Sequence, residues 1–225
     1  MDLYSMCYNL CLFDLDGTLT DPKLGITKSF QYALAAFGIH EELDQLIRFI
    51  GPPLRESFKN AYGFSDEDTE KAVAKHREYF SVTGLYENAI IPNIPEILEK
   101  LKNDGCILAV VTNKPTYFAK KILRHFNIDG YFSLVCGDDM KGSLTINGKC
   151  DLINTARNRL DPERNLSVVM IGDRQDDVIG ARNAGIDSIG VLWGYGTAEE
   201  LEAAKATKIV NTVDELYLWL IGEAQ

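Results

Sequence analysis

The chain has 225 residues, 46% of them hydrophobic and 25% charged, and its formal net charge is −10. This is the composition of an ordinary globular protein, long enough for one large domain or two small ones. The acidic balance contains no block of basic residues, which argues against nucleic acid or an anionic membrane as a partner.

The cysteine and histidine content narrows the possible classes of protein further. The five cysteines are odd in number and form no Cys-x-x-Cys pair, which indicates free thiols in a reducing compartment. The three histidines are scattered along the chain, so no zinc site or histidine-based triad is indicated. No apolar run approaches the ~18–20 residues of a transmembrane helix. The N-terminus lacks the basic region of a signal peptide, and we expect a cytoplasmic protein.

The first expected element is a buried strand at 10–13, a short run of apolar residues. Asp14 and Asp16 follow at once, two carboxylates two residues apart, and Gly17 then lets the chain turn sharply. Buried like charges are tolerable only if a cation lies on them or one proton is shared. In open α/β sheets, ligands bind just beyond the carboxyl ends of the strands, which is where these carboxylates would lie.

The next part of the chain has a helical pattern and no expected strand. Apolar residues at helical spacing predict helices at 26–37 and 43–50, and the Pro52-Pro53 pair separates these from another helix. Ser65 with Asp68 resembles a capping box ahead of a helix at 66–81. Residues 22–88 are therefore expected to form a helical bundle.

From Pro92 onward helices and strands alternate. The expected helices are at 94–102, 116–126, 151–160, 176–184, 199–204 and 213–221, and the expected strands at 106–111, 134–136, 168–171, 188–192 and 209–210. Continuous apolar strands separated by helices are typical of a parallel sheet covered on both faces. We therefore predict a Rossmann-like α/β core with an inserted, all-helical domain.

Reactive side chains follow three of these strands: the Asp14 pair, Thr112 with Asn113, and Asp173 with Asp177. In a parallel sheet these ends lie on the same edge, so residues far apart in sequence would meet in one pocket. Each side chain alone is weak evidence, since Thr112 could cap a turn and either aspartate could stabilise a helix N-terminus. Their joint placement favours a functional site.

An acidic cluster of this kind suits Mg²⁺, because no histidine or cysteine accompanies it. A bound cation would let a negatively charged substrate approach. Thr112 and the main-chain N–H groups beside Asn113 could then bind phosphate oxygens, and a lysine would neutralise charge in the transition state. Lys149, just before the helix at 151–160, is the first candidate for that lysine, and Lys114 is the competitor.

Four motifs resemble those of the haloacid dehalogenase superfamily in their order and spacing. They are DLDGTLTD at 14–21, Thr112 in VVTN at 110–113, Lys149, and GDRQDD at 172–177. The family often has a proline after the lysine, where this chain has Cys150. The segments FIGPPL at 49–54 and GIDSIGV at 185–191 are similar to the phosphoglycolate phosphatase branch.

The resemblance implies roles for these residues. Asp14 would attack phosphorus and form an aspartyl-phosphate, while Asp16 would protonate the leaving alkoxide and then activate water. Mg²⁺ would be held by Asp14, Asp173 and the main-chain carbonyl of Asp16, with Asp177 as a ligand or as the holder of a metal-bound water. Thr112, Asn113 and Lys149 would hold the phosphate. Dehalogenases lack the second aspartate, so its presence favours phosphoester chemistry.

The resemblance also implies a core domain at 1–20 and 89–225 and a mobile helical cap at 21–88. A closing cap would exclude water and contact the leaving group, and Arg55 is either a contact to substrate or a solvent-facing helix residue. The expected function is hydrolysis of a small phosphate monoester, as in phosphoglycolate phosphatase, by a monomer or homodimer. The alternatives are a 5'-nucleotidase, a pyrophosphatase or a β-phosphoglucomutase-like transferase of the same superfamily, or, in another class, a receiver-like signalling module.

Overall fold

The computed structural model describes residues 7–141, 143–145 and 147–223. Within them, six parallel strands form one sheet in the order β5-β4-β1-β6-β7-β8. The strands are β1 (Leu10–Phe13), β4 (Ile107–Pro115), β5 (Leu134–Asp138), β6 (Val168–Gly172), β7 (Asp187–Val191) and β8 (Lys208–Val210). The predicted α/β class with a parallel sheet is confirmed.

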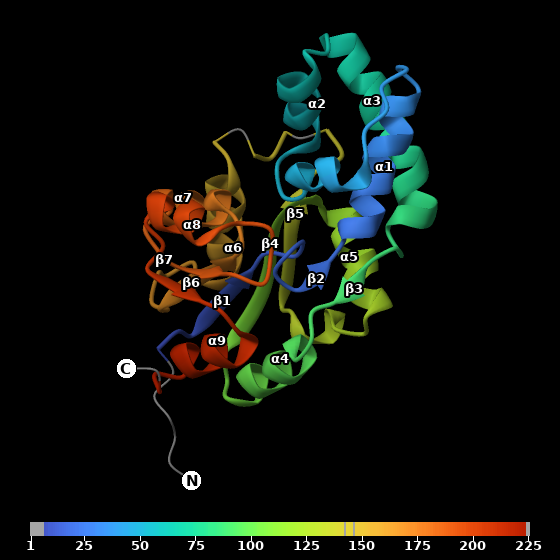
Figure 1. The fold of residues 1–225 in the computed structure, drawn as a ribbon. Coiled ribbons are helices and arrows are strands. Elements are labelled where there is room, and N and C mark those ends of the chain that lie inside the picture. Colours follow the sequence, from blue (N-terminus) through green and yellow to red (C-terminus); the bar gives the residue numbers. More distant parts are fainter. Residues whose placement is uncertain (1–6, 142, 146, 224–225) are drawn as a thin grey trace.

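Helices cover both faces of this sheet (Figure 1). One face packs against α4 (Ile94–Asn103), α5 (Thr116–His125) and α9 (Val213–Leu220), and the other against α6 (Lys149–Leu160), α7 (Gln175–Asn183) and α8 (Ala198–Ala204). Alternate residues of β1 belong to the two resulting cores: Leu10 and Leu12 to one, Cys11 and Phe13 to the other. All four are fully buried, which explains the uninterrupted apolar run in the sequence.

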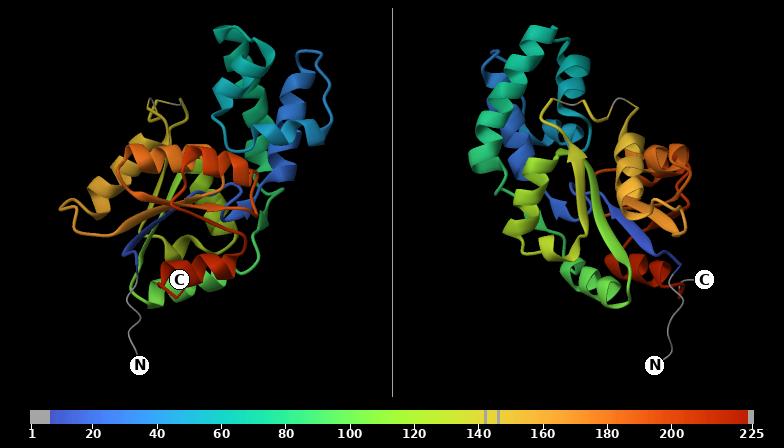
Figure 2. Two further views of the ribbon diagram at one scale, coloured as in Figure 1. Left: turned by 60° about the vertical axis from the view of Figure 1, so that its left-hand side comes forward. Right: turned by 180° about the vertical axis from the view of Figure 1, so that it is seen from behind.

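The helical insert stands above the carboxyl ends of the strands (Figure 2). It contains α1 (Lys23–Ala35), a 3₁₀ helix (Leu43–Phe49), α2 (Leu54–Tyr62), α3 (Asp66–Tyr79) and a π-helical turn (Phe80–Gly84). Its interior is aromatic: Phe30 stacks on Phe49 with ring centroids 4.6 Å apart and contacts Phe58 at 4.9 Å. The helix expected at 43–50 is thus a tighter 3₁₀ helix, and the one expected at 66–81 changes to π geometry after Tyr79.

A two-stranded antiparallel ribbon links the insert to the sheet domain. Its strands are β2 (Thr20–Asp21) and β3 (Ala89–Ile90), where the chain leaves the first strand region and returns to it. The sequence did not predict this ribbon, because two residues are too few for an alternating pattern. Within the described residues, every helix is too short or too polar to cross a bilayer.

Candidate active site

The turn after β1 positions Asp14 and Asp16. The main-chain N–H of Asp14 donates to the carbonyl of Ile171 at 2.8 Å, so Asp14 continues the pairing between β1 and β6. Gly17 follows with φ of +82°, and a Cβ there would lie 2.3 Å from a carboxylate oxygen of Asp173. Only glycine can adopt this backbone conformation and also leave room for the Asp173 carboxylate. Asp14 and Asp16 are both buried.

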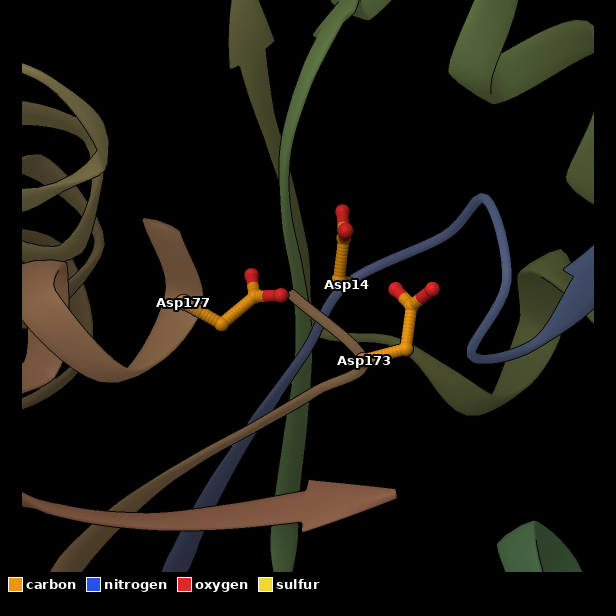
Figure 3. Close-up of side chains that lie close together, drawn as sticks. All are labelled: Asp14, Asp173 and Asp177. Atoms are coloured by element: carbon orange, nitrogen blue, oxygen red, sulfur yellow. The ribbon is translucent and has the colours of Figure 1, made fainter. Parts of the chain in front are cut away.

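Three carboxylates converge at this edge of the sheet (Figure 3). One oxygen from each of Asp14, Asp173 and Asp177 lies within 4.8 Å of the other two. Asp173 follows β6 and accepts a hydrogen bond from the main-chain N–H of Tyr195 at 2.8 Å. Asp177, in the first turn of α7, accepts from the N–H of Arg174 at 3.0 Å. The sheet and the helix N-terminus thus bring together residues about 160 positions apart, as predicted.

The electrostatics of this cluster favour a cation. Burial and the neighbouring carboxylates raise the pKa of Asp173 well above its ordinary value, with Asp177 and Asp14 contributing. Burial raises the pKa of Asp177 to about 7, although Lys149 opposes the shift. One oxygen of Asp14 is buried without a hydrogen-bond partner in the described part of the chain. Three convergent carboxylate oxygens are suitable ligands for a hard divalent cation such as Mg²⁺.

The Asp16 carboxylate is not part of that group of three. Burial raises its pKa, and the charge of Lys114 opposes the shift. Lys114 Nζ lies 2.8 Å from the Asp16 carboxylate, and both side chains are almost completely buried. A contribution of the main-chain carbonyl of Asp16 to a metal site stays a prediction.

Lys149 begins α6 and extends into the carboxylate cluster. Its Nζ lies 3.0 Å from Asp14 and also forms a short ion pair with Asp177. Burial disfavours the charged form of Lys149, but the two aspartates outweigh this effect and raise its pKa. The structure therefore places both candidate lysines in the site, with different carboxylate partners. The sequence could not assign these partners.

Thr112 and Asn113 end the regular part of β4. The Thr112 side chain is buried, and its hydroxyl accepts a hydrogen bond from the N–H of Lys114 at 3.3 Å. The Asn113 side chain instead donates to the carbonyl of Gly51 in the insert, at 3.4 Å. Arg174 makes a second such contact, since its guanidinium donates to the Ile50 carbonyl at 2.8 Å. The insert is therefore bonded to the edge of the sheet that carries the site.

A cavity of about 380 Å³ lies between this edge and the insert. The sheet domain contributes Asp16, Lys114 and Phe118, among others, and the insert contributes a largely aromatic and cationic wall. Arg55 lines the cavity, but its guanidinium is paired with Glu70 at 2.5 and 3.0 Å. The Arg55 charge therefore already has a partner, and a contact between Arg55 and substrate stays a prediction.

Some residues near the site were not predicted from the sequence. The Gly194-Tyr195-Gly196 loop was not among the predicted site segments, yet the main-chain N–H of Tyr195 donates to Asp173, and the Tyr195 hydroxyl donates to Asp21. A signal was present, because this glycine-rich loop follows a strand at the same sheet edge. His76 and Arg77 also line the cavity. Nothing in the sequence distinguishes these two residues beyond their place on a helix.

The chain is similar in sequence to several known proteins. Residues 11–191 match the family model described as haloacid dehalogenase-like hydrolase. A 5'-nucleotidase from Pseudomonas aeruginosa is 47% identical over 203 residues, 89% of this chain and 90% of that protein. A tyrosine-protein kinase, PtkA, from Mycobacterium tuberculosis is 39% identical and covers 92% of this chain and 70% of its own length.

A more distant relative and a solved structure are also described as phosphatases. A phosphoglycolate phosphatase from Aquifex aeolicus is 32% identical, over 82% of this chain and 84% of that protein. The crystal structure of a predicted phosphatase from Clostridium acetobutylicum superposes with a TM-score of 0.90 at 44% identity, over 97% of this chain and all of the other.

Proposed function

The chain belongs to the haloacid dehalogenase-like hydrolases and is a phosphatase of that family, and we propose that it hydrolyses small phosphate monoesters by way of an aspartyl-phosphate at Asp14. The observation that carries this proposal is the pairing of two adjacent carboxylates with two different lysines. Asp14 pairs with Lys149 at 3.0 Å and Asp16 with Lys114 at 2.8 Å. Two carboxylates in separate electrostatic environments can take separate roles, one as nucleophile and one as acid and base.

In the proposed reaction Asp14 attacks phosphorus, and the bond from phosphorus to the ester oxygen breaks. Asp16 protonates the departing alkoxide, which its raised pKa favours. It later removes a proton from the water that attacks phosphorus, so that the bond from the Asp14 oxygen to phosphorus breaks and inorganic phosphate leaves. Lys149, charged and buried beside Asp14, neutralises charge on the transferring phosphoryl group. The Thr112 hydroxyl, buried where the regular pairing of β4 ends, would bind a phosphate oxygen.

We further propose that Asp14, Asp173 and Asp177 hold Mg²⁺, together with the main-chain carbonyl of Asp16. The convergent oxygens of the three carboxylates and the raised pKa values of Asp173 and Asp177 support this assignment. A bound Mg²⁺ would supply positive charge that offsets the repulsion between Asp14 and an anionic phosphate. Whether Asp177 binds the ion directly or through water stays open in this proposal.

The division into domains is also a proposal: a core at 1–20 and 89–225, and a cap at 21–88. The β2–β3 ribbon lies at both crossings and supports these boundaries. Among the described residues, hydrogen bonds from Asn113 at 3.4 Å and Arg174 at 2.8 Å join the cap main chain to the sheet edge, and so few polar contacts suit a cap that opens and closes. We propose a cytoplasmic protein, because its five cysteines are free, as is usual in a reducing compartment. We also propose that it is a monomer or a homodimer.

Two substrate classes remain within this proposal. Phosphoglycolate is one, on the similarity to proteins of that name. Nucleoside 5'-monophosphates are the second, and two observations favour them: the relative named 5'-nucleotidase is the more similar, and several aromatic rings line the cavity beside its charged side chains. The glycolate group is small and anionic, and would leave most of a cavity of about 380 Å³ unfilled.

A phosphate-release assay with Mg²⁺ over a panel of esters tests this function. We expect turnover of at least one small phosphate monoester, and loss of that turnover in EDTA with recovery when Mg²⁺ is restored. The panel includes phosphoglycolate, nucleoside 5'-monophosphates, pyrophosphate and glucose 1-phosphate. Conversion of glucose 1-phosphate to glucose 6-phosphate without phosphate release would instead indicate a mutase, and a single phosphate per protein would indicate a receiver-like module.

A further inference from the structure

Arg77, on α3, is a partly buried arginine that lines the cavity from the side of the cap. Within the described residues, its guanidinium forms no ion pair and no hydrogen bond, and none of its nitrogens is fully covered by protein. A charge that is partly withdrawn from water is usually paired with an opposite charge, because its desolvation costs free energy. The unpaired charge of Arg77 therefore requires an explanation.

The other lysines and arginines along the cavity all have carboxylate partners. These ion pairs are Lys114 with Asp16, Arg55 with Glu70, and Lys59 with Asp66. Among the described residues, Arg77 is thus the one cavity-lining lysine or arginine whose charge is not neutralised by a partner. A guanidinium in this situation is suited to bind an anionic group of a ligand, since its paired N–H donors match the two oxygens of a carboxylate or a phosphate.

The charged part of the Arg77 side chain, and not only its hydrocarbon part, lies toward the cavity. Burial and the neighbouring charge of Arg55 lower the pKa of Arg77. Glu70 and, from the core, Asp138 and Asp139 oppose this shift. Arg55 and the two core aspartates also line the cavity. Because charges on both walls act on the guanidinium, it lies between the cap and the core.

The two core aspartates are already hydrogen-bonded within their own loop. The Asp138 carboxylate accepts from the main-chain N–H groups of Asp139 at 2.8 Å and Leu144 at 3.0 Å, and the Asp139 carboxylate accepts from the N–H of Ser143 at 2.9 Å. Neither carboxylate forms an ion pair with Arg77. The charge of Arg77 is therefore available to a ligand in the cavity.

The same cavity connects Arg77 with the reacting groups. Asp16 and Lys114 line it on the side of the core. In the proposed reaction Asp16 protonates the oxygen that leaves, so the leaving group begins beside Asp16 and extends through the cavity toward the cap. An anionic group at the far end of the leaving group would meet the Arg77 guanidinium.

We propose that Arg77 is a specificity-determining residue that binds a second anionic group, a carboxylate or a phosphate, on the leaving group of the substrate. This inference rests on the proposed phosphatase function and names a feature of the substrate of the same site. The carboxylate of phosphoglycolate and the 3'-phosphate of a nucleoside 3',5'-bisphosphate are two groups of this chemistry. The competing explanation is that Arg77 attracts Asp138 and Asp139 and so holds the cap, in which case it would affect all esters equally.

The test compares esters in matched pairs that differ in one anionic group of the leaving group. The pairs are phosphoglycolate with ethyl phosphate, and adenosine 3',5'-bisphosphate with adenosine 5'-monophosphate, and kcat/KM is measured for loss of the phosphate common to both members. We expect the wild-type enzyme to prefer the anionic leaving group in one pair, and the pair that shows the preference distinguishes a carboxylate from a phosphate.

Arg77→Gln should lower this preference by about tenfold or more, the effect of losing charge-assisted hydrogen bonds. Arg77→Lys, which keeps the charge, should retain part of it. Lys71→Gln is the matched control, because it removes one positive charge from an exposed position on the same helix, away from the cavity, and it should leave the preference unchanged.

Three results would overturn the proposal. An equal loss on both members of each pair in Arg77→Gln would assign Arg77 to the contact between cap and core. An unchanged preference in Arg77→Gln would mean that Arg77 does not contact the leaving group. A wild-type enzyme that prefers the uncharged leaving group in both pairs would refute the anion site while leaving phosphatase activity intact.

Binding of the same esters to Asp14→Asn, which lacks the proposed nucleophile, is measured by calorimetry with Mg²⁺ in parallel. Tighter binding of an anionic member that is lost when Arg77→Gln is added would support the site even without phosphate release. No binding and no release would refute both proposals.

Discussion

Asp14 and Asp16 are separated by one residue, yet a different lysine neutralises each. Strand β1 directs both toward the sheet edge, while α6 brings Lys149 to Asp14 and the end of β4 brings Lys114 to Asp16. In the proposed mechanism, this difference in partners separates the nucleophile from the acid and base. Because Lys114 lies beside Asp16 and also under Phe80 of the insert, it connects acid–base chemistry with the cap.

Lys114→Met tests this assignment through the pH dependence of the reaction. Burial raises the pKa of Asp16 and the charge of Lys114 opposes that shift, so removing the charge raises the pKa further. The first step needs protonated Asp16, so the alkaline limb of kcat/KM against pH should move to higher pH. Lys120→Met, at an exposed position on α5, is the control and should keep the wild-type profile. An alkaline limb that stays in place or moves to lower pH would contradict the role of Asp16 as acid.

The sequence predicted that Asp14, Thr112 and Asp173 lie together, because the ends of parallel strands converge. Each of these residues follows an apolar run, and parallel pairing brings such positions to one edge. The lysine partners could not be predicted, since they depend on the irregular register between Thr112 and Pro115 and on the exact start of α6. The Arg55–Glu70 pair was equally out of reach, because it depends on how α2 and α3 pack against each other.

At the scale of elements, the loop after β7 forms a support for Asp173. The N–H of Tyr195 donates to Asp173, and Gly194 packs so closely that a Cβ there would lie 2.3 Å from the Asp173 Cβ. It would also lie 2.5 Å from the carbonyl oxygen of Gly17, so main chain as well as side chain would have to shift. The sequence showed a glycine-rich loop but not which carboxylate it supports.

Gly194→Ala is therefore expected to displace Asp173 and weaken metal binding. Groups that orient metal ligands typically change metal affinity by about 10–100-fold, and we expect a rise of that order in the Mg²⁺ concentration for half-maximal activity. Gly130→Ala is the matched control, because a Cβ there meets nothing within 4 Å. A normal Mg²⁺ requirement in Gly194→Ala would show that the loop does not support the metal site.

At the scale of the whole molecule, the predicted parallel sheet and helical insert are both present, and long periodic segments made them predictable. What could not be predicted is the contact between the two parts. It depends on side chains such as Arg174 and Asn113 that reach main-chain carbonyls at 50 and 51, a geometry without a sequence pattern.

Arg174→Met tests whether this contact holds the cap over the site. The variant loses the hydrogen bond to Ile50, and we expect KM to rise about fivefold with a smaller change in kcat, the effect of losing ~1 kcal/mol. Arg174 also pairs with Glu200 at 2.9 Å, so Glu200→Gln is the control that removes the ion pair alone. Equal KM increases in the two variants would assign the effect to the ion pair and not to the cap.

Peptide mapping by mass spectrometry shows directly whether Asp14 carries the phosphoryl group. Asp16→Asn is mixed with Mg²⁺ and p-nitrophenyl phosphate, whose leaving group needs little protonation, so the first step proceeds while hydrolysis lacks its base. After an acid quench we predict one phosphoryl group on Asp14, and none when Asp14→Asn is added to the same variant. A phosphoryl group on any other residue, or undiminished turnover in Asp14→Asn alone, would contradict the account.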